Sequence, residues 1–314
     1  MAGDALTREV LFAGGAFVLG AAVGSFLNVV IYRLPREDEG LSVARPRRSF
    51  CPSCRSTLRW YENIPLVSWL LQAGRCRHCR EPIPLRYFGI ELLTATLFTI
   101  VAYKDLVLVD PPRWGLAAVS AALLAAMVAV TWIDLDHMII PDRIDKPAML
   151  LAPFVSYLVP ALHPAVRAYG QYRFDGDITI LVGWAAALGW GDGRLGLDPR
   201  MAAAVSSLVG IAFGLALIWT IRALGSLAFR KEAMGLGDVK YMGMLGGYLG
   251  WTGVLLTLGV AVIAGALIGI VMKLFTREPY VPFGPFLSLG GAVTLLAREP
   301  LLWGLLVWYP SLVR

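Results

Sequence analysis

The chain has 314 residues, of which 57% are hydrophobic and only 16% are charged, and its mean hydropathy is +0.66. Soluble domains are about 45–50% apolar and about 25% charged, so this composition excludes a disordered chain, a coiled coil and an ordinary soluble enzyme. The net charge of +6 lies entirely within residues 33–86, which hold eleven Arg and five acids. Basic charge confined to one segment indicates a cytoplasmic loop of a membrane protein, with no need for a nucleic-acid partner.

Apolar segments on both sides of this basic loop are long enough to cross a bilayer, which takes about 20 mainly apolar residues. Residues 11–32 carry no charge and are too long for a signal-peptide core, so they predict a retained helix. Further spans are predicted at about 87–103, 114–133, 147–160, 201–221, 239–250, 252–274 and 284–309. The last contains Arg298, Glu299 and Pro300, so it is either one broken helix or two segments. The sequence therefore predicts an all-α polytopic membrane protein with seven to eight transmembrane helices.

The basic loop sets the expected orientation, because Lys and Arg are enriched in cytoplasmic loops. With residues 33–86 inside, the N-terminus lies outside, and counting spans places residues 134–146, 222–238 and 273–283 inside. Those three ends carry further basic residues, namely Arg143, Lys146, Arg222, Arg230, Lys231, Lys273 and Arg277. The loop also lies where anionic lipid headgroups of the bilayer can contact it.

All four cysteines lie in this loop, as the pairs Cys51-x-x-Cys54 and Cys76-x-x-Cys79. Two such knuckles are typical of a zinc ribbon, in which four thiolates complete a tetrahedron and leave no open position for catalysis. Disulfides or free thiols are the alternatives, and the cytoplasm disfavours disulfides. His78, inside the second knuckle, could replace a cysteine. We expect a structural Zn²⁺ in a small zinc-ribbon-like domain inserted after the first helix. So short a module has few large apolar side chains to form a core, and it needs a bound metal to stabilise its fold.

Carboxylates stand beside apolar spans at two places. The first group is Asp134, Asp136 and Asp142, and the second is Asp238, which follows Gly235-Leu-Gly237. Ionisable residues at a membrane span are costly and suggest function. A pair of acids that shares one proton can activate water for attack on a peptide carbonyl. The alternative is that these acids are helix caps or solvated helix ends, which suits Asp136 and Asp142 best, and His137 suits an interfacial role.

Taken together, these motifs resemble the bifunctional type IV prepilin peptidases, a GxGD aspartic protease family. The resemblance covers nearly the whole chain: residues 24–35, 45–54, 60–69, 74–79, 86–91, the pattern Asp-x5-Ile-Pro-Asp at 134–142, Gly-x-Gly-Asp at 235–238, and Pro-Phe-Gly-Pro-Phe at 282–286. It implies that Asp134 and Asp238 are catalytic, supported by Gly235, Gly237, Pro141 and Asp142. It also implies a transmembrane peptidase domain over residues 87–314, after a first helix at 1–32 and the cysteine loop at 33–86.

The resemblance further implies the substrates, the cosubstrate and the location. The substrates would be type IV prepilins and pseudopilins, cleaved at the cytoplasmic face of the bacterial inner membrane and then N-methylated with S-adenosylmethionine. No dinucleotide-type glycine motif marks a site for the methyl donor, and the region of Asn28 and Arg33 is only a candidate. Asp134 and Asp238 are farther apart than is usual for the family, which suggests an insertion at about 161–200.

Two other functions remain open at this stage. One is a peptidase without methyltransferase activity. The other is a non-enzymatic scaffold or transporter with a zinc module, which would leave the two acids without a role. The sequence does not indicate an oligomeric state or the pilus or secretion system served.

Overall fold

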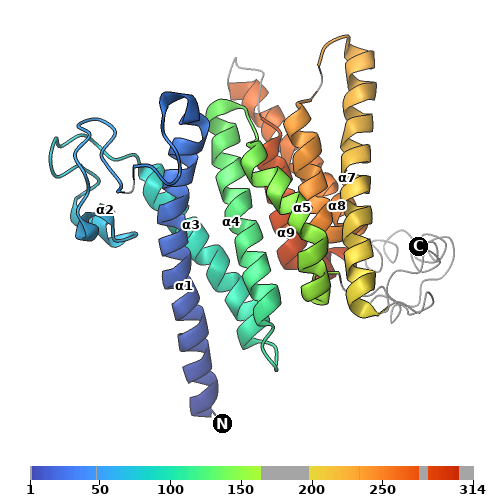
Figure 1. The fold of residues 1–314 in the computed structure, drawn as a ribbon, viewed down its shortest axis with the longest axis horizontal. Coiled ribbons are helices and arrows are strands. Elements are labelled where there is room, and N and C mark those ends of the chain that lie inside the picture. The colour runs from blue at the N-terminus through green and yellow to red at the C-terminus, as the bar shows by residue number, and fades with distance from the viewer. Residues whose placement is uncertain (1, 47, 164–197, 233, 276–281, 304–314) are drawn as a thin grey trace. The chain divides into compact units, whose positions relative to one another are not determined.

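The helices of the chain begin and end close to where the apolar segments predict. The computed structural model describes residues 2–46, 48–163, 198–232, 234–275 and 282–303, and within these ranges it is helical, with isolated β-bridges in place of strands (Figure 1). The chain divides into two compact units, Met1–Met138 and Ile139–Arg314. The predicted all-α class is confirmed.

The first unit contains three long helices, α1 (Ala2–Arg33), α3 (Leu85–Ala102) and α4 (Trp114–His137), with a short π-helix, η3 (Tyr103–Val107), after α3. Helices α1 and α3 touch through their backbones. A Cβ on Gly20 would lie 2.7 Å from the Cα of Ala95, and a Cβ on Gly24 would lie 2.7 Å from the Cα of Glu91. Small residues four positions apart allow such close packing between helices in a membrane.

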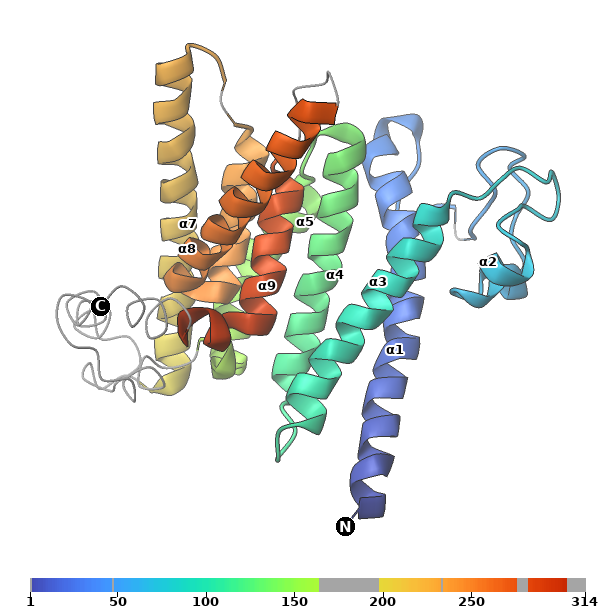
Figure 2. The ribbon, with the colours of Figure 1, turned by 180° about the vertical axis from the view of Figure 1, so that it is seen from behind.

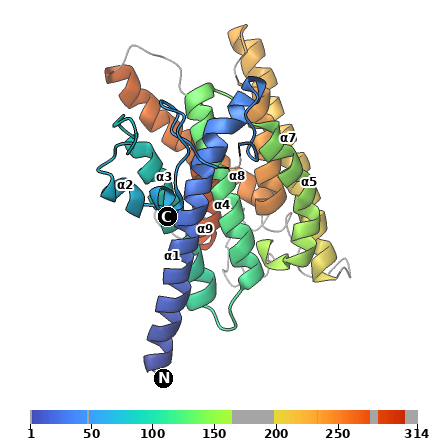
Figure 3. The same cartoon turned by 60° about the vertical axis from the view of Figure 1, so that its left-hand side comes forward.

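Residues 33–86, hereafter the cysteine module, connect α1 to α3 and contain only short helices. These are η1 (Leu34–Glu39), η2 (Trp60–Asn63) and α2 (Val67–Leu71), and Figure 3 shows them beside the ends of α1 and α3. The buried guanidinium of Arg33, at the end of α1, donates hydrogen bonds to the carbonyls of Pro46 (2.6 Å) and Arg48 (3.2 Å). The loop is thus fastened to the last turn of α1.

The second unit contains α5 (Asp142–Leu158), η4 (Pro160–Leu162), α7 (Pro199–Phe229), α8 (Leu236–Phe275) and α9 (Gly284–Trp303), seen from behind in Figure 2. Its tightest contact joins α7 and α8 at two glycines. A Cβ on Gly210 would overlap the carbonyl oxygen of Gly246, and a Cβ on Gly246 would overlap the carbonyl oxygen of Gly210. Neither position therefore has room for a side chain.

Helix α8 bends back on itself at Gly250, the boundary between the predicted spans 239–250 and 252–274. Gly250 has φ 70° and ψ 174°, a conformation open essentially only to glycine. A Cβ on Gly246 would lie 3.0 Å from Cγ2 of Val254, whereas eight residues of straight helix extend about 12 Å. The two halves of α8 are thus antiparallel segments, as Figure 2 also shows.

Five helical segments among the described residues are long and apolar enough to cross a membrane: Thr7–Glu37, Leu85–Val107, Trp114–His137, Pro199–Ala228 and Leu236–Leu274. The predicted spans at 147–160 and 284–309 correspond to α5 and α9, which are not among these five. Helix α9 is one broken helix, with a non-helical conformation at Ala297. Residues 304–309 of the last predicted span and residues 164–197 of the expected insertion lie outside the described residues.

Candidate active site and metal centre

The two cysteine knuckles have the same backbone geometry. In the first, Cys51 N–H donates to the carbonyl of Ser56, and Arg55 N–H donates back to the carbonyl of Cys51. In the second, Cys76 N–H donates to the carbonyl of Glu81, and Arg80 N–H donates to the carbonyl of Cys76. Arg55 and Arg80 both adopt positive φ, at 57° and 62°. Each knuckle is a tight turn that presents its two thiols on one side.

The four thiols converge on one point. The Sγ atoms of Cys51, Cys54, Cys76 and Cys79 all lie within 4.8 Å of one another, and those of Cys51 and Cys79 are 3.9 Å apart. Tetrahedral zinc with Zn–S bonds of about 2.3 Å needs sulfur atoms about 3.8 Å apart, so the donor set fits this ion. Hydrogen bonds from Ser56 lower the pKa of Cys54 to about 6, which favours the thiolate that binds metal. The sequence prediction that these cysteines cluster is confirmed.

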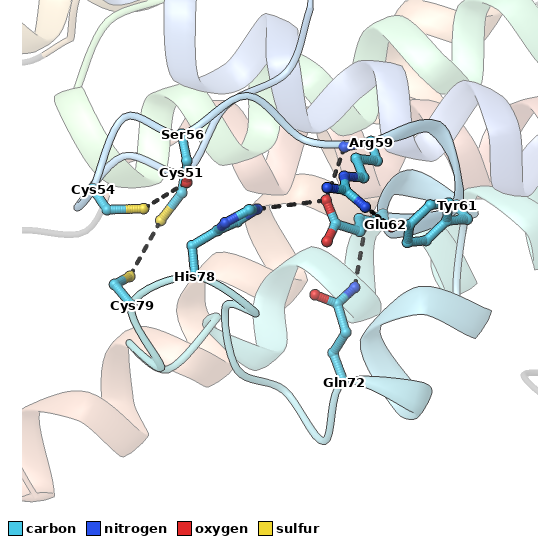
Figure 4. A network of polar contacts seen from close by, with 9 residues as sticks. All are labelled: Cys51, Cys54, Ser56, Arg59, Tyr61, Glu62, Gln72, His78 and Cys79. Atoms are coloured by element: carbon cyan, nitrogen blue, oxygen red, sulfur yellow. Dashed lines mark hydrogen bonds and ion pairs between the residues drawn. The ribbon is translucent and has the colours of Figure 1, made fainter.

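A buried carboxylate ties the cysteine cluster to η2 (Figure 4). Oε2 of Glu62, which is 7% exposed, accepts the backbone N–H of Arg59 at 2.8 Å and lies 3.8 Å from Nε2 of His78. The amide of Gln72 donates to the Glu62 carbonyl at 3.3 Å. His78 thus points from the second knuckle toward Glu62, which gives it a partner outside the four thiols.

The first aspartate motif begins in the last turn of α4. Asp134 is 5% exposed, and its carbonyl accepts the N–H of Met138, whose left-handed conformation ends the helix. Asp136 accepts two hydrogen bonds from the guanidinium of Arg86 on α3, at 2.8 and 2.7 Å. This ion pair joins the last turn of α4 to α3.

The rest of that motif packs against the glycine-rich motif within the second unit. Pro141 is the N-cap of α5, and Asp142 follows it. A Cβ on Gly237 would lie 3.1 Å from the Cβ of Ile140, and the ammonium of Lys240 donates to the Asp142 carboxylate. Segments that are about 100 residues apart in the sequence therefore meet here.

Asp238 lies in the first turn of α8 and is 9% exposed. A helix N-terminus stabilises a negative charge, because the first backbone N–H groups point outward. A Cβ on Gly235 would lie 3.5 Å from Oδ2 of Asp238, in van der Waals contact, so Gly235 lies directly beside this carboxylate.

Helix α5 carries two acids one turn apart in opposite environments. Hydrogen bonds from Lys146 and Lys240 lower the pKa of Asp142. Asp145 is completely buried, and neither of its carboxylate oxygens has a hydrogen-bond partner among the described residues. Burial raises the pKa of Asp145 to about 7, opposed by the charge of Lys240 and assisted by the charges of Asp142 and Asp238. The sequence reasoning missed Asp145, because only the packing of α5 against α7 and α8 shows which face is buried.

The two candidate residues for the methyl donor are occupied by internal contacts. The amide of Asn28 donates to the carbonyl of Tyr87 at 3.1 Å, which joins α1 to α3. The guanidinium of Arg33 donates to loop carbonyls and lies 5.6 Å from the ring centroid of Phe50. Asn28 thus joins α1 to α3, and Arg33 joins α1 to the cysteine module; their assignment to the methyl donor stays a prediction.

Comparison with known proteins now adds to this geometry. Residues 18–104 match the bacterial peptidase A24 N-terminal domain, and residues 178–270 match the type IV leader peptidase family. The chain is 32% identical to the prepilin leader peptidase/N-methyltransferase of Aeromonas hydrophila, over 93% of this chain and 92% of that protein. The chain belongs to the type IV leader peptidase family. The second match contains Asp238, whereas Asp134 lies between the two matched ranges.

Further relatives in the family have similar descriptions. A prepilin leader peptidase/N-methyltransferase of Myxococcus xanthus is 37% identical over 85% of this chain and 64% of that protein. A type 4 prepilin-like proteins leader peptide-processing enzyme of Escherichia coli is 32% identical over 89% of this chain and 92% of that protein. No solved structure matches the chain.

Proposed function

We propose that this chain is a membrane aspartic endopeptidase that removes the leader from type IV prepilins and pseudopilins and then N-methylates the new N-terminal residue. Asp134 and Asp238 are its catalytic acids. Gly235, Gly237, Pro141 and Asp142 position them. The family membership and the names of the relatives support the reaction class.

The observation that carries the assignment of residues is the contact between the two aspartate motifs. Ile140 lies against Gly237, and Asp142 pairs with Lys240, so the segment that follows Asp134 is fixed beside the segment that contains Asp238. A scaffold or transporter has no need of two acidic motifs that recognise each other in this way. The contact therefore favours an aspartic peptidase over a non-enzymatic function.

The chemistry of such a pair is hydrolysis by water. The ionised aspartate takes a proton from water as the oxygen attacks the scissile carbonyl carbon, and the protonated aspartate donates its proton as the peptide C–N bond breaks. The leader leaves with a new carboxylate, and the mature pilin keeps a free amine. Methylation places a methyl group on that amine nitrogen, which loses one proton, and S-adenosylmethionine supplies the methyl group when bound.

The metal of the cysteine module is structural Zn²⁺, held by Cys51, Cys54, Cys76 and Cys79. Four protein thiolates leave no open coordination position, so this ion organises the loop and takes no part in hydrolysis. The module faces the cytoplasm, because the net charge of +6 lies within it, and the protein resides in the bacterial inner membrane.

Mass spectrometry of a prepilin co-expressed with the enzyme tests this proposal. Wild type should yield a cleaved, methylated pilin. Asp134→Asn and Asp238→Asn should each lower cleavage by at least about a hundredfold, since an acid or base typically contributes 10²–10⁴. Asp136→Asn is the matched control and should cleave within a few-fold of wild type, because its carboxylate pairs with Arg86. Normal cleavage by either of the first two variants would refute the assignment.

A further inference from the structure

The cysteine module contains a cleft that the peptidase chemistry does not use. Its volume is about 490 Å³, within the range of small-molecule sites. It is lined by residues from two segments of the first knuckle's hairpin and from η2: Arg48, Ser49, Leu58, Arg59, Trp60, Tyr61 and Asn63. The lining therefore includes two arginines, two aromatic residues and one asparagine.

The framework of this cleft is fixed by buried groups. The carbonyl of Arg48 accepts a hydrogen bond from Arg33, and the carbonyl of Ser49 accepts one from Leu58 N–H at 2.9 Å. On the other side, Glu62 holds the backbone of Arg59 (Figure 4). The walls are thus pre-organised, which reduces the entropy lost when a ligand binds.

The side chains of Trp60 and Arg59 remain available to a ligand, whereas the ring of Tyr61 has the guanidinium of Arg77 over its face, 5.5 Å from the ring centroid. Trp60 is 80% exposed, so one large indole surface lies open to solvent. Arg59 donates one N–H to the hydroxyl of Tyr61 at 2.8 Å, which orients the guanidinium and leaves its other N–H groups available. Among the described residues that line the cleft, none is acidic. The cleft therefore suits a ligand with an aromatic ring and a carboxylate.

We propose that the cleft bounded by Arg48, Arg59 and Trp60 binds S-adenosylmethionine; this inference rests on the proposed N-methyltransferase activity. The adenine stacks on the indole of Trp60, as bases stack on aromatic side chains. The guanidinium groups bind the carboxylate of the methionine part, which Arg recognises through paired hydrogen bonds. The cationic sulfonium lies beside the indole of Trp60, since the π-face of this ring attracts cations.

The charge of the cleft makes a second consequence testable. S-adenosylhomocysteine, the product of methyl transfer, has a neutral sulfur in place of the sulfonium. Because the cleft carries two guanidinium groups and no lining acid, we expect the product to bind at least as tightly as the donor.

Equilibrium dialysis with radiolabelled S-adenosylmethionine, on the full chain in neutral detergent, tests the proposal. Trp60→Ala and Arg59→Ala should each weaken binding by about tenfold, the scale of one stacked base or one charged contact, and Trp60→Phe should restore most of it. The matched controls are Leu71→Ala, whose side chain is also 80% exposed, and Arg45→Ala, an exposed arginine outside the cleft. Both controls should bind within twofold of wild type.

Cleavage of a co-expressed prepilin and the metal content should stay unchanged in all these variants, which separates loss of the site from loss of the fold. Wild-type affinity in Trp60→Ala and Arg59→Ala would overturn the proposal. So would variants that bind the donor normally but lose binding to phosphatidylglycerol vesicles, because the cleft would then hold a lipid headgroup. A wild-type enzyme that cleaves but binds no donor would instead refute the methyltransferase half of the proposed function.

Discussion

The cysteine module and the α7–α8 pair are held together in different ways. The module has short helices, and its loops are fixed by the hydrogen bonds that buried Arg33 donates and buried Glu62 accepts, and by four converging thiols. Helices α7 and α8 instead touch backbone to backbone at Gly210 and Gly246. We therefore expect the module to depend on a bound metal ion, whereas the helix pair depends on the absence of side chains. A change that unfolds one of these regions should therefore leave the other folded.

Among the changes that should affect one region and spare the other, removal of the metal should have the largest effect on stability. In a small module the free energy of metal binding is folding free energy, about 10–16 kcal/mol for structural Zn²⁺ sites. Cys51→Ser or a strong chelator should unfold residues 33–86 while α7 and α8 stay folded. Limited proteolysis with mass mapping of the cut sites, together with metal analysis, measures this. If the module stays resistant to proteolysis after complete loss of the metal, metal binding by the thiols does not stabilise its fold.

A side chain introduced at the contact between α7 and α8 should destabilise the second unit and leave the cysteine module folded. Gly246→Leu would place atoms on the Gly210 carbonyl, and such overpacking typically costs 1–3 kcal/mol or more. The variant should lower the thermal stability of the second unit but keep one equivalent of metal. Gly259→Leu, at a glycine on α8 with no atom within 4 Å, is the control and should melt like wild type. Equal melting of both variants would contradict the close contact.

The buried acid of α5 should make the second unit sensitive to pH. The pKa of Asp145 is about 7 in the fold and about 3.8 when unfolded, so the folded state holds the proton more tightly. The contribution of Asp145 to the free energy of unfolding is therefore fully present below about pH 4. It is lost as the pH rises from about 4 to 7, and it changes no further above pH 7. Three pKa units correspond to about 4 kcal/mol.

Asp145→Asn should remove this slope. The variant should gain stability over wild type at pH 8 and show no gain at pH 4.5, as measured by thermal unfolding in detergent. Asp142→Asn is the counterpart, because the pKa of Asp142 is lowered by Lys146 and Lys240 and its loss should not stabilise the protein at pH 8. A slope that persists in Asp145→Asn would assign the pH dependence to another group.

The ion pair between Arg86 and Asp136 should have the smallest effect. Both side chains are about a third exposed, and exposed ion pairs typically contribute 0–1 kcal/mol. Arg86→Gln should therefore change the melting temperature of the first unit only slightly, and less so at high salt. A large loss of stability would mean that this pair fixes the end of α4 more firmly than its exposure indicates.

Local sequence patterns predicted the features of the fold that depend on local chemistry. Apolar length predicted the helices, the break near residue 251 appeared at Gly250, and the CxxC spacing predicted the thiol cluster. The missed features depend on contacts between distant segments. The burial of Asp145 depends on α7 and α8, and the partner of Asp136 is 50 residues away. The pairing of the catalytic acids stays a prediction.

The most direct test of the account is the mass of a pilin N-terminus produced beside three forms of this enzyme. Wild type should give a cleaved and methylated pilin, Trp60→Ala a cleaved pilin with its methylation reduced, and Asp238→Asn an uncleaved prepilin. That pattern would assign cleavage to the acid at α8 and methylation to the cysteine module. A normally methylated product from Trp60→Ala, or a cleaved product from Asp238→Asn, would contradict it.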